Sequence, residues 1–98
     1  MATLREKLLS MITSGFEFSR GSPLPFGATV LRGGINFSVF SKHATGVTLL
    51  LFYPGDAEPL VEFPLDPRLN RTGDVWHAFL LGLNPGMHYA FRMERTPP

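Results

Sequence analysis

The stretch Asn70-Arg-Thr-Gly-Asp-Val-Trp-His77 decides the fold, together with its continuation into Asn84-Pro-Gly86 and His88-Tyr-Ala-Phe-Arg92. It contains a polar turn, an apolar segment, a Pro-Gly turn and a second apolar segment. In Asn84-Pro-Gly86, proline presets φ at the second turn position and glycine supplies the positive φ that a type II turn needs at the third. Because aromatic and β-branched residues flank this turn, we predict a β-hairpin formed by residues 75–81 and 88–93.

Four apolar segments upstream have the pattern of further strands. They cover residues 28–31, 35–40, 47–53 and 60–65, with Gly, Pro and Asp residues between most of them. Strands at this spacing, joined by short turns, are typical of a two-sheet sandwich. The predicted fold class is therefore all-β, an immunoglobulin-like antiparallel β-sandwich.

The N-terminal segment has the pattern of a short helix. Thr3-Leu-Arg-Glu6 has the form of a capping box, and apolar residues follow at helical spacing. We predict a helix near residues 4–13, a helix-and-linker region at 1–23 and the sandwich at 24–98. The linker region is rich in Gly and Pro, yet phenylalanines lie in and beside it, and at least one is expected to fill an edge of the core: Phe16, Phe18 or Phe26.

Two of the predicted strands are apolar on both faces, those at residues 47–53 and 75–81. A strand of this kind is covered on both faces, whereas an isolated two-sheet sandwich covers only one. This excess of apolar side chains predicts that another domain packs on the sandwich. The candidate interface residues are Leu50, Phe52, Trp76 and Leu80.

Length and composition exclude several classes of protein. The 98 residues form one domain, far short of the about 250 residues of a catalytic barrel. The chain has no cysteine and a net charge of +1 without a basic stripe, so disulfides and a nucleic-acid partner are not expected. We find no secretion signal and no membrane-spanning run, and the expected location is cytoplasmic. Without export, the glycosylation patterns at Asn36 and Asn70 are coincidental.

The polar residues do not suggest catalysis or metal binding. The acidic residues lie mostly in turns or at strand ends, and no pair of carboxylates is placed for glycoside hydrolysis. The histidines His43, His77 and His88 lack metal-ligand spacing. No catalytic residue, metal or cofactor is predicted. An ion pair between Arg71 and Asp74 would hold the long polar loop in shape; the alternative is two solvated charges.

Sugar binding is the open alternative for the aromatic residues. Aromatic faces bind glucose rings at concave sites with a few convergent polar groups. Trp76, Tyr89 and Tyr53 are the candidate carbohydrate-binding residues. For Trp76, packing in the core or at a domain interface is favoured, because a lone tryptophan in an apolar strand is usually packed.

The quoted motifs resemble one family. Asn70–His77, followed by Gly-Leu-Asn-Pro-Gly and Tyr-Ala-Phe-Arg, is similar to the N-terminal β-sandwich of isoamylase-type glycogen debranching enzymes, and so is Gly33-Gly-Ile-Asn-Phe-Ser-Val-Phe-Ser41 upstream. The resemblance implies a carbohydrate-binding-module-like, early-set immunoglobulin fold. It also implies a parent glycoside hydrolase acting on α-1,6-glucosidic bonds, with its catalytic (β/α)8 barrel outside this chain. The domain is then expected to pack on that barrel and shape access to it.

Two other functions stay open. The first is an autonomous module that binds glycogen or another α-glucan, and the second is an immunoglobulin-like interaction domain unrelated to carbohydrate. The resemblance weighs against the first, because related glycogen-binding domains of the regulatory-kinase type carry a lysine and tryptophans at positions held here by Ala90, Pro97 and Phe40.

Overall fold

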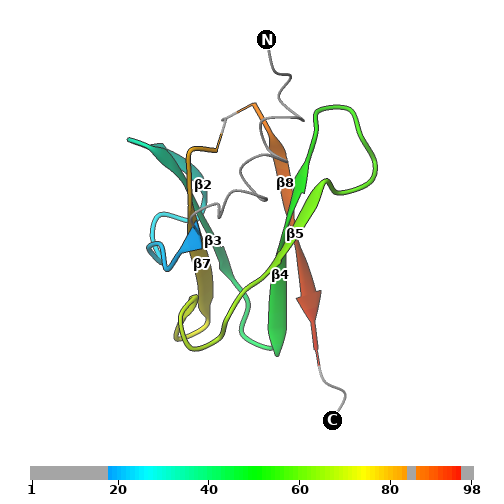
Figure 1. The fold of residues 1–98 in the computed structure, drawn as a ribbon. Helices are drawn as coiled ribbons and strands as arrows, with labels where there is room; N and C mark the ends of the chain where they lie inside the picture. The colour runs from blue at the N-terminus through cyan, green and yellow to red at the C-terminus, as the bar shows by residue number, and fades with distance from the viewer. Residues whose placement is uncertain (1–17, 84–85, 96–98) are drawn as a thin grey trace.

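The computed structural model describes residues 18–83 and 86–95, and all regular structure in these residues is β-strand. The strands are β1 (Phe18–Ser19), β2 (Gly27–Leu31), β3 (Gly34–Phe40), β4 (Gly46–Phe52), β5 (Val61–Pro64), β6 (Arg71–Thr72), β7 (Val75–Leu81) and β8 (His88–Glu94). They form two layers, with β2, β3 and β7 in one and β4, β5 and β8 in the other (Figure 1). The predicted N-terminal helix lies outside the described residues.

All strand pairs are antiparallel, and the two sheets differ in width. Sheet A has the order β1-β7-β3-β2, with β6 pairing on β7 as well. Sheet B has the order β5-β4-β8. The prediction of an all-β antiparallel sandwich is confirmed.

The predicted hairpin between β7 and β8 is wrong. β7 pairs with β3, from Leu81 opposite Gly34 to Val75 opposite Phe40. β8 lies in the other sheet and pairs along its length with β4. The physical reason is that β3 occupies one edge of β7, while β1 and β6 occupy the other, so no edge is left for β8. The connection therefore crosses between the sheets, and its Asn84 and Pro85 lie outside the described residues.

The core lies between the sheets and follows from the alternation of side chains along each strand. Buried apolar residues project inward from β3, β4 and β7, and the core is completed by residues of the loops between strands. Its members are Ile35, Phe37, Ala44, Val47, Leu49, Leu51, Leu65, Trp76, Ala78, Leu80, Leu83 and Met87. Burying each large side chain of this set contributes roughly 1.5–3 kcal/mol.

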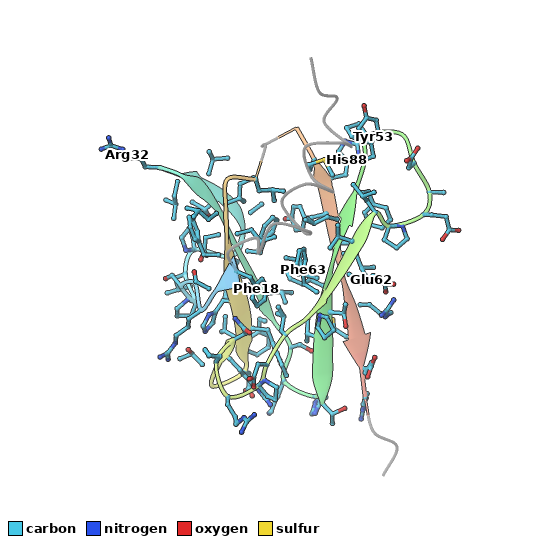
Figure 2. All side chains as sticks on the ribbon, in the orientation of Figure 1. Phe18, Arg32, Tyr53, Glu62, Phe63 and His88 are labelled. Carbon is cyan, nitrogen blue, oxygen red and sulfur yellow. The ribbon has the colours of Figure 1, made fainter. Side chains whose placement is uncertain are left out.

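One side of the sandwich is closed by an aromatic pair. β1 and β5 are the outermost strands there, and the rings of Phe18 and Phe63 stack with centroids 5.4 Å apart (Figure 2). Phe18 packs against the core, which confirms that a phenylalanine of the predicted linker region fills a core edge. We call this the closed side.

The opposite side is not closed. β3 lies across from β8, because Phe37 and Tyr89 meet edge to face at 5.0 Å. Sheet A then continues to β2, whereas sheet B ends at β8. Among the strands that the structure describes, none lies opposite β2. We call this the open side and define it by the inward-facing residues of β2 and β8: Ala28, Val30, Tyr89, Phe91 and Met93.

Candidate interdomain surface

The structure corrects the expectation for two of the four proposed interface residues. Trp76 and Leu80 are 0% exposed and belong to the core. They share the inward face of β7 with Ala78, because β7 pairs with β3 in the register that places Trp76 opposite Val39 and Leu80 opposite Ile35. Neither side chain is therefore available to a partner or to a sugar on the folded domain.

Trp76 is covered at its end of the core by the neighbouring loop. The Arg71 guanidinium lies over the indole, 4.8 Å from the ring centroid, a distance typical of a cation–π contact. Its Nε–H donates to the Gly73 carbonyl at 2.8 Å, and Nη2 lies 3.5 Å from Asp74 Oδ1. The predicted Arg71–Asp74 ion pair is present, and it orients the side chain that seals Trp76.

The other two residues, Leu50 and Phe52, lie on the outer face of sheet B and are half-buried. Leu50 is flanked by Glu62 on β5 and Ala90 on β8. Beside it, Arg92 Nη1 and Glu62 Oε1 form an ion pair at 2.6 Å that spans β4, and both side chains are about half exposed. Polar side chains thus border this apolar strip on two sides, and the face has the composition of a solvated surface.

The two tyrosines occupy different places. Tyr89 faces inward on β8, where it meets Phe37 and Phe91 edge to face, and its side chain is 39% exposed on the open side. Tyr53 follows the end of β4 and lies near His88, at the end of sheet B where β8 begins (Figure 2). With Trp76 in the core, the three aromatic residues named as sugar contacts do not share one surface.

Of the three positions compared with glycogen-binding domains, two lie in the described part of the chain. Phe40 is exposed at the end of β3, opposite Val75 on the outer face of sheet A. Ala90 is half-buried on the outer face of sheet B, and Pro97 lies outside the described residues. Phe40 and Ala90 are on opposite sheets and do not form a common platform.

Residues 19–23, which we call the strap, lie across the outer face of sheet A. The Asn36 side chain accepts from the Ser22 N–H at 2.7 Å and donates to the Ser22 carbonyl at 3.0 Å. The Ser38 hydroxyl donates to the Pro23 carbonyl at 2.6 Å. These buried groups are satisfied by backbone, as buried polar groups require. Residues 18–23 are therefore integral to the sandwich, not part of a linker.

A second pair of buried polar residues, His77 and Asn70, also binds the strap. We call the hydrogen bonds that Asn36, Ser38, His77 and Asn70 make to the strap the clamp. His77 Nδ1 lies 2.7 Å from the Arg20 carbonyl oxygen, which only accepts, so Nδ1 carries a proton. Nε2 lies 2.8 Å from the Thr72 hydroxyl. The Asn70 amide donates to the Ser19 carbonyl at 3.5 Å, and its oxygen accepts from the Asp66 N–H at 3.0 Å.

The clamp explains the two glycosylation patterns in the sequence. Asn36 and Ser38 lie two residues apart on one strand and both face the strap, while Asn70 and Thr72 hold the loop and His77. Both asparagines are buried, and their amides already have backbone partners. At Asn36 and Ser38 the pattern therefore arises from the two-residue repeat of a strand face that binds backbone, whereas at Asn70 and Thr72 it arises from side chains that hold a loop and His77.

Two features are absent from residues 18–83 and 86–95, the part of the chain that the structure describes. No group of three or more His, Asp or Glu side chains there is close enough to hold a metal ion. Nor is there a helix of the length and apolarity that a membrane crossing requires.

Comparison with known proteins decides the family. Residues 25–97 match the family model of carbohydrate-binding module 48, the isoamylase N-terminal domain. The chain belongs to this family. Isoamylase SU1 of Zea mays is 51% identical over 78 residues, which are 76% of this chain and 10% of that protein. A glycogen debranching enzyme of Yersinia pseudotuberculosis is 44% identical over 76 residues, 78% of this chain and 11% of the relative.

The module 48 fold also recurs in solved structures. A pullulanase from Paenibacillus barengoltzii, in complex with maltohexaose and α-cyclodextrin, matches 79% of this chain with a TM-score of 0.64 and 17% identity. The match covers 12% of the pullulanase chain. Our chain thus spans about a tenth of the length of these relatives.

Sequence reasoning missed two exposed apolar residues of the module 48 chain that occupy inward strand positions. Val30 and Met93 are 64% and 44% exposed although their strand positions face inward. In the sequence both look like ordinary core residues. The alternation of side chains along a strand predicts which face a residue occupies, but it does not predict how wide the opposite sheet is. The sequence also contained no signal for the strap, whose partners are 14 to 57 residues apart.

Proposed function

We propose that this chain is the non-catalytic N-terminal accessory domain of an α-glucan debranching glycoside hydrolase. The parent enzyme acts on α-1,6-glucosidic bonds of glycogen or starch, and the module packs on its catalytic (β/α)8 barrel and shapes access to the active site. The carrying observation is membership of the isoamylase N-terminal family, at 44–51% identity to proteins named isoamylase and glycogen debranching enzyme.

The ion pairs formed by three acidic residues support a non-catalytic role for the chain. Glu62, Asp66 and Asp74 each pair with an arginine on the domain surface. Glycoside hydrolysis needs two carboxylates that face each other across a sugar. These three acids pair with neighbouring arginines instead, and the chemistry is assigned to the rest of the parent enzyme.

For the compartment we propose a reducing one, the cytoplasm. The cysteine-free composition supports this, since such a chain needs no oxidising environment to fold. The maize relative is named chloroplastic, and a plant parent would place the domain in the plastid instead.

The test is a domain replacement. The complete 98-residue chain is inserted in place of the matching segment of the Yersinia pseudotuberculosis enzyme, with a deletion of that segment as the control. We expect the debranching activity of the graft to be at least roughly tenfold higher than that of the deletion variant. The reason is that one properly covered interface is worth more than about 1.4 kcal/mol, which corresponds to a factor of ten. A graft no more active than the deletion, and no better folded by circular dichroism, would overturn the proposal.

An autonomous α-glucan-binding module is the second candidate, and the family description with the exposed Tyr89 ring favours it. Tyr89 and Tyr53 are then the proposed contacts, whereas Trp76 is excluded by its burial. Titration of the isolated chain with maltoheptaose discriminates the two functions. Binding that disappears in Tyr89→Ala, but persists in the exposed-residue control Leu69→Ala, would favour this candidate.

A further inference from the structure

The open side is apolar, whereas the neighbouring outer face of sheet B combines the Leu50 and Phe52 strip with charged side chains. On β8 the outward positions carry His88, Ala90, Arg92 and Glu94, and Arg92 is paired with Glu62. The inward positions of the same strand carry Tyr89, Phe91 and Met93. Normally the inward residues would be the buried ones.

Exposure reverses this expectation at the open side. Val30 on β2 and Met93 on β8 are more exposed than Leu50 and Phe52, the half-buried residues of the outer face. The Tyr89 hydroxyl reaches under β2, 3.7 Å from where a Cβ on Gly27 would stand. The Tyr89 side chain therefore reaches from β8 to the beginning of β2 on the open side.

The backbone is open at the same place. β2 pairs only with β3, and β8 only with β4, so each presents one unpaired strand edge among the described residues. Unpaired strand edges beside exposed apolar side chains are aggregation-prone, and natural proteins cover or protect them. Two such edges with apolar residues between them are a surface built to be covered.

We propose that the open side, and not the outer face of sheet B, is the surface on which the module docks against the body of its parent enzyme. The inference rests on the proposed function. The occupant is assigned to the same polypeptide because proteins that carry this module are about ten times its length, and the solved pullulanase carries the fold within one long chain. Its contacting surface is apolar, since the open-side side chains offer no charge to pair.

The test uses the grafted enzyme described above and the isolated 98-residue chain. In Val30→Lys/Met93→Lys two exposed apolar side chains become charged at the proposed contact. We expect it to lower debranching activity of the graft by at least roughly tenfold, the size of a buried interface contact. The melting temperature of the isolated chain should stay unchanged, because both side chains are exposed there.

Two further variants serve as controls. Leu69→Lys changes an apolar residue of matched exposure, 46%, that lies outside the open side, and it should leave the graft fully active. Val30→Thr/Met93→Gln keeps the side-chain size without adding charge. We expect this variant to lose less activity than the lysine variant. A loss that follows the added charge, and not the substitution as such, indicates a disturbed contact and not misfolding.

Each other outcome counts against the inference. An active graft that tolerates Val30→Lys/Met93→Lys but loses activity in Leu50→Lys/Phe52→Lys would overturn the docking surface and leave the proposed function standing. Dimers of the isolated chain in sedimentation that Val30→Lys dissociates would assign the surface to a second copy. An inactive unsubstituted graft would count against the proposed function itself, and the inference would fall with it.

Discussion

The closed and open sides of the sandwich are built from the same kinds of residue but differ in how far these residues are buried. On the closed side, Phe18 and Phe63 stack across the two sheets and pack against the core. On the open side, Val30 and Met93 also face inward, yet both are largely exposed. The difference is sheet width, because sheet A extends to β2 and sheet B stops at β8.

The comparison teaches that inward orientation and burial are separate properties. Orientation follows from the position of a residue in the strand, whereas burial also requires a strand or another body on the opposite side. Apolar residues of the closed side therefore stabilise the isolated domain. On the open side, the exposed Val30 and Met93 contribute little to stability until something covers them.

The largest effect is expected at the strap, next to the closed side. Gly21 has φ +73°, and a Cβ added there would lie 2.6 Å from the Ala78 carbonyl carbon of β7. Gly21→Ala should lower the free energy of unfolding by about 3 kcal/mol or more, because strain adds to lost strap hydrogen bonds. Urea denaturation followed by Trp76 fluorescence measures this.

Gly55 is the matched control for that substitution. Its φ is +88°, and a Cβ there would meet nothing within 4 Å. Gly55→Ala should cost only about 1 kcal/mol, the backbone term alone. Equal losses for the two variants would mean that the strap does not stabilise the sheet it crosses.

A smaller effect compares the two sides directly. Phe63→Ala removes one ring of the closed-side stack and should cost about 2 kcal/mol, less than a fully buried phenylalanine because Phe63 is only half-buried. Val30→Ala on the open side should cost less than about 0.5 kcal/mol. Thermal unfolding of the isolated chain is the measurement. A Val30 loss equal to that of Phe63 would show that the open side is covered even in the isolated chain.

The smallest effect concerns the polar face beside the open side. A double-mutant cycle with Arg92→Ala and Glu62→Ala should give a coupling energy below about 1 kcal/mol, because both side chains are about half exposed. The coupling should fall as salt is added. The longer and more exposed pair Arg68–Asp66, at 3.6 Å, is the control and should couple less. A strong coupling that is insensitive to salt would contradict a solvated outer face.

Local pattern was sufficient to place the long strands. The predicted segments 35–40 and 75–81 correspond to β3 and β7 within one residue at their ends. The two-sided apolarity of β7 was also visible, but its cause was not. Its outward face is covered only in part by the strap, whose Arg20 carbonyl lies 2.7 Å from His77 Nδ1, while Leu81 on the same face is 41% exposed.

Pairing was beyond local pattern. The Pro-Gly turn favoured a hairpin, but β7 found its partners at β3, β1 and β6. A turn fixes only how the chain reverses, whereas the choice between a hairpin and a crossing between sheets depends on which strand edges are already occupied. Two of the four candidate interface residues were also wrong, since Trp76 and Leu80 lie on the core face of β7, and local pattern does not show which face of a strand that is apolar on both sides is the core.

By itself the sequence determined the strand segments, the alternation of their faces and the family, because these depend on neighbouring residues and on motifs such as Asn70–His77. Only the tertiary structure decided which face of β7 is the core, which residues clamp the strap and which side of the sandwich is open. These depend on contacts between segments far apart in the chain and on the unequal widths of two sheets. No run of consecutive residues encodes either.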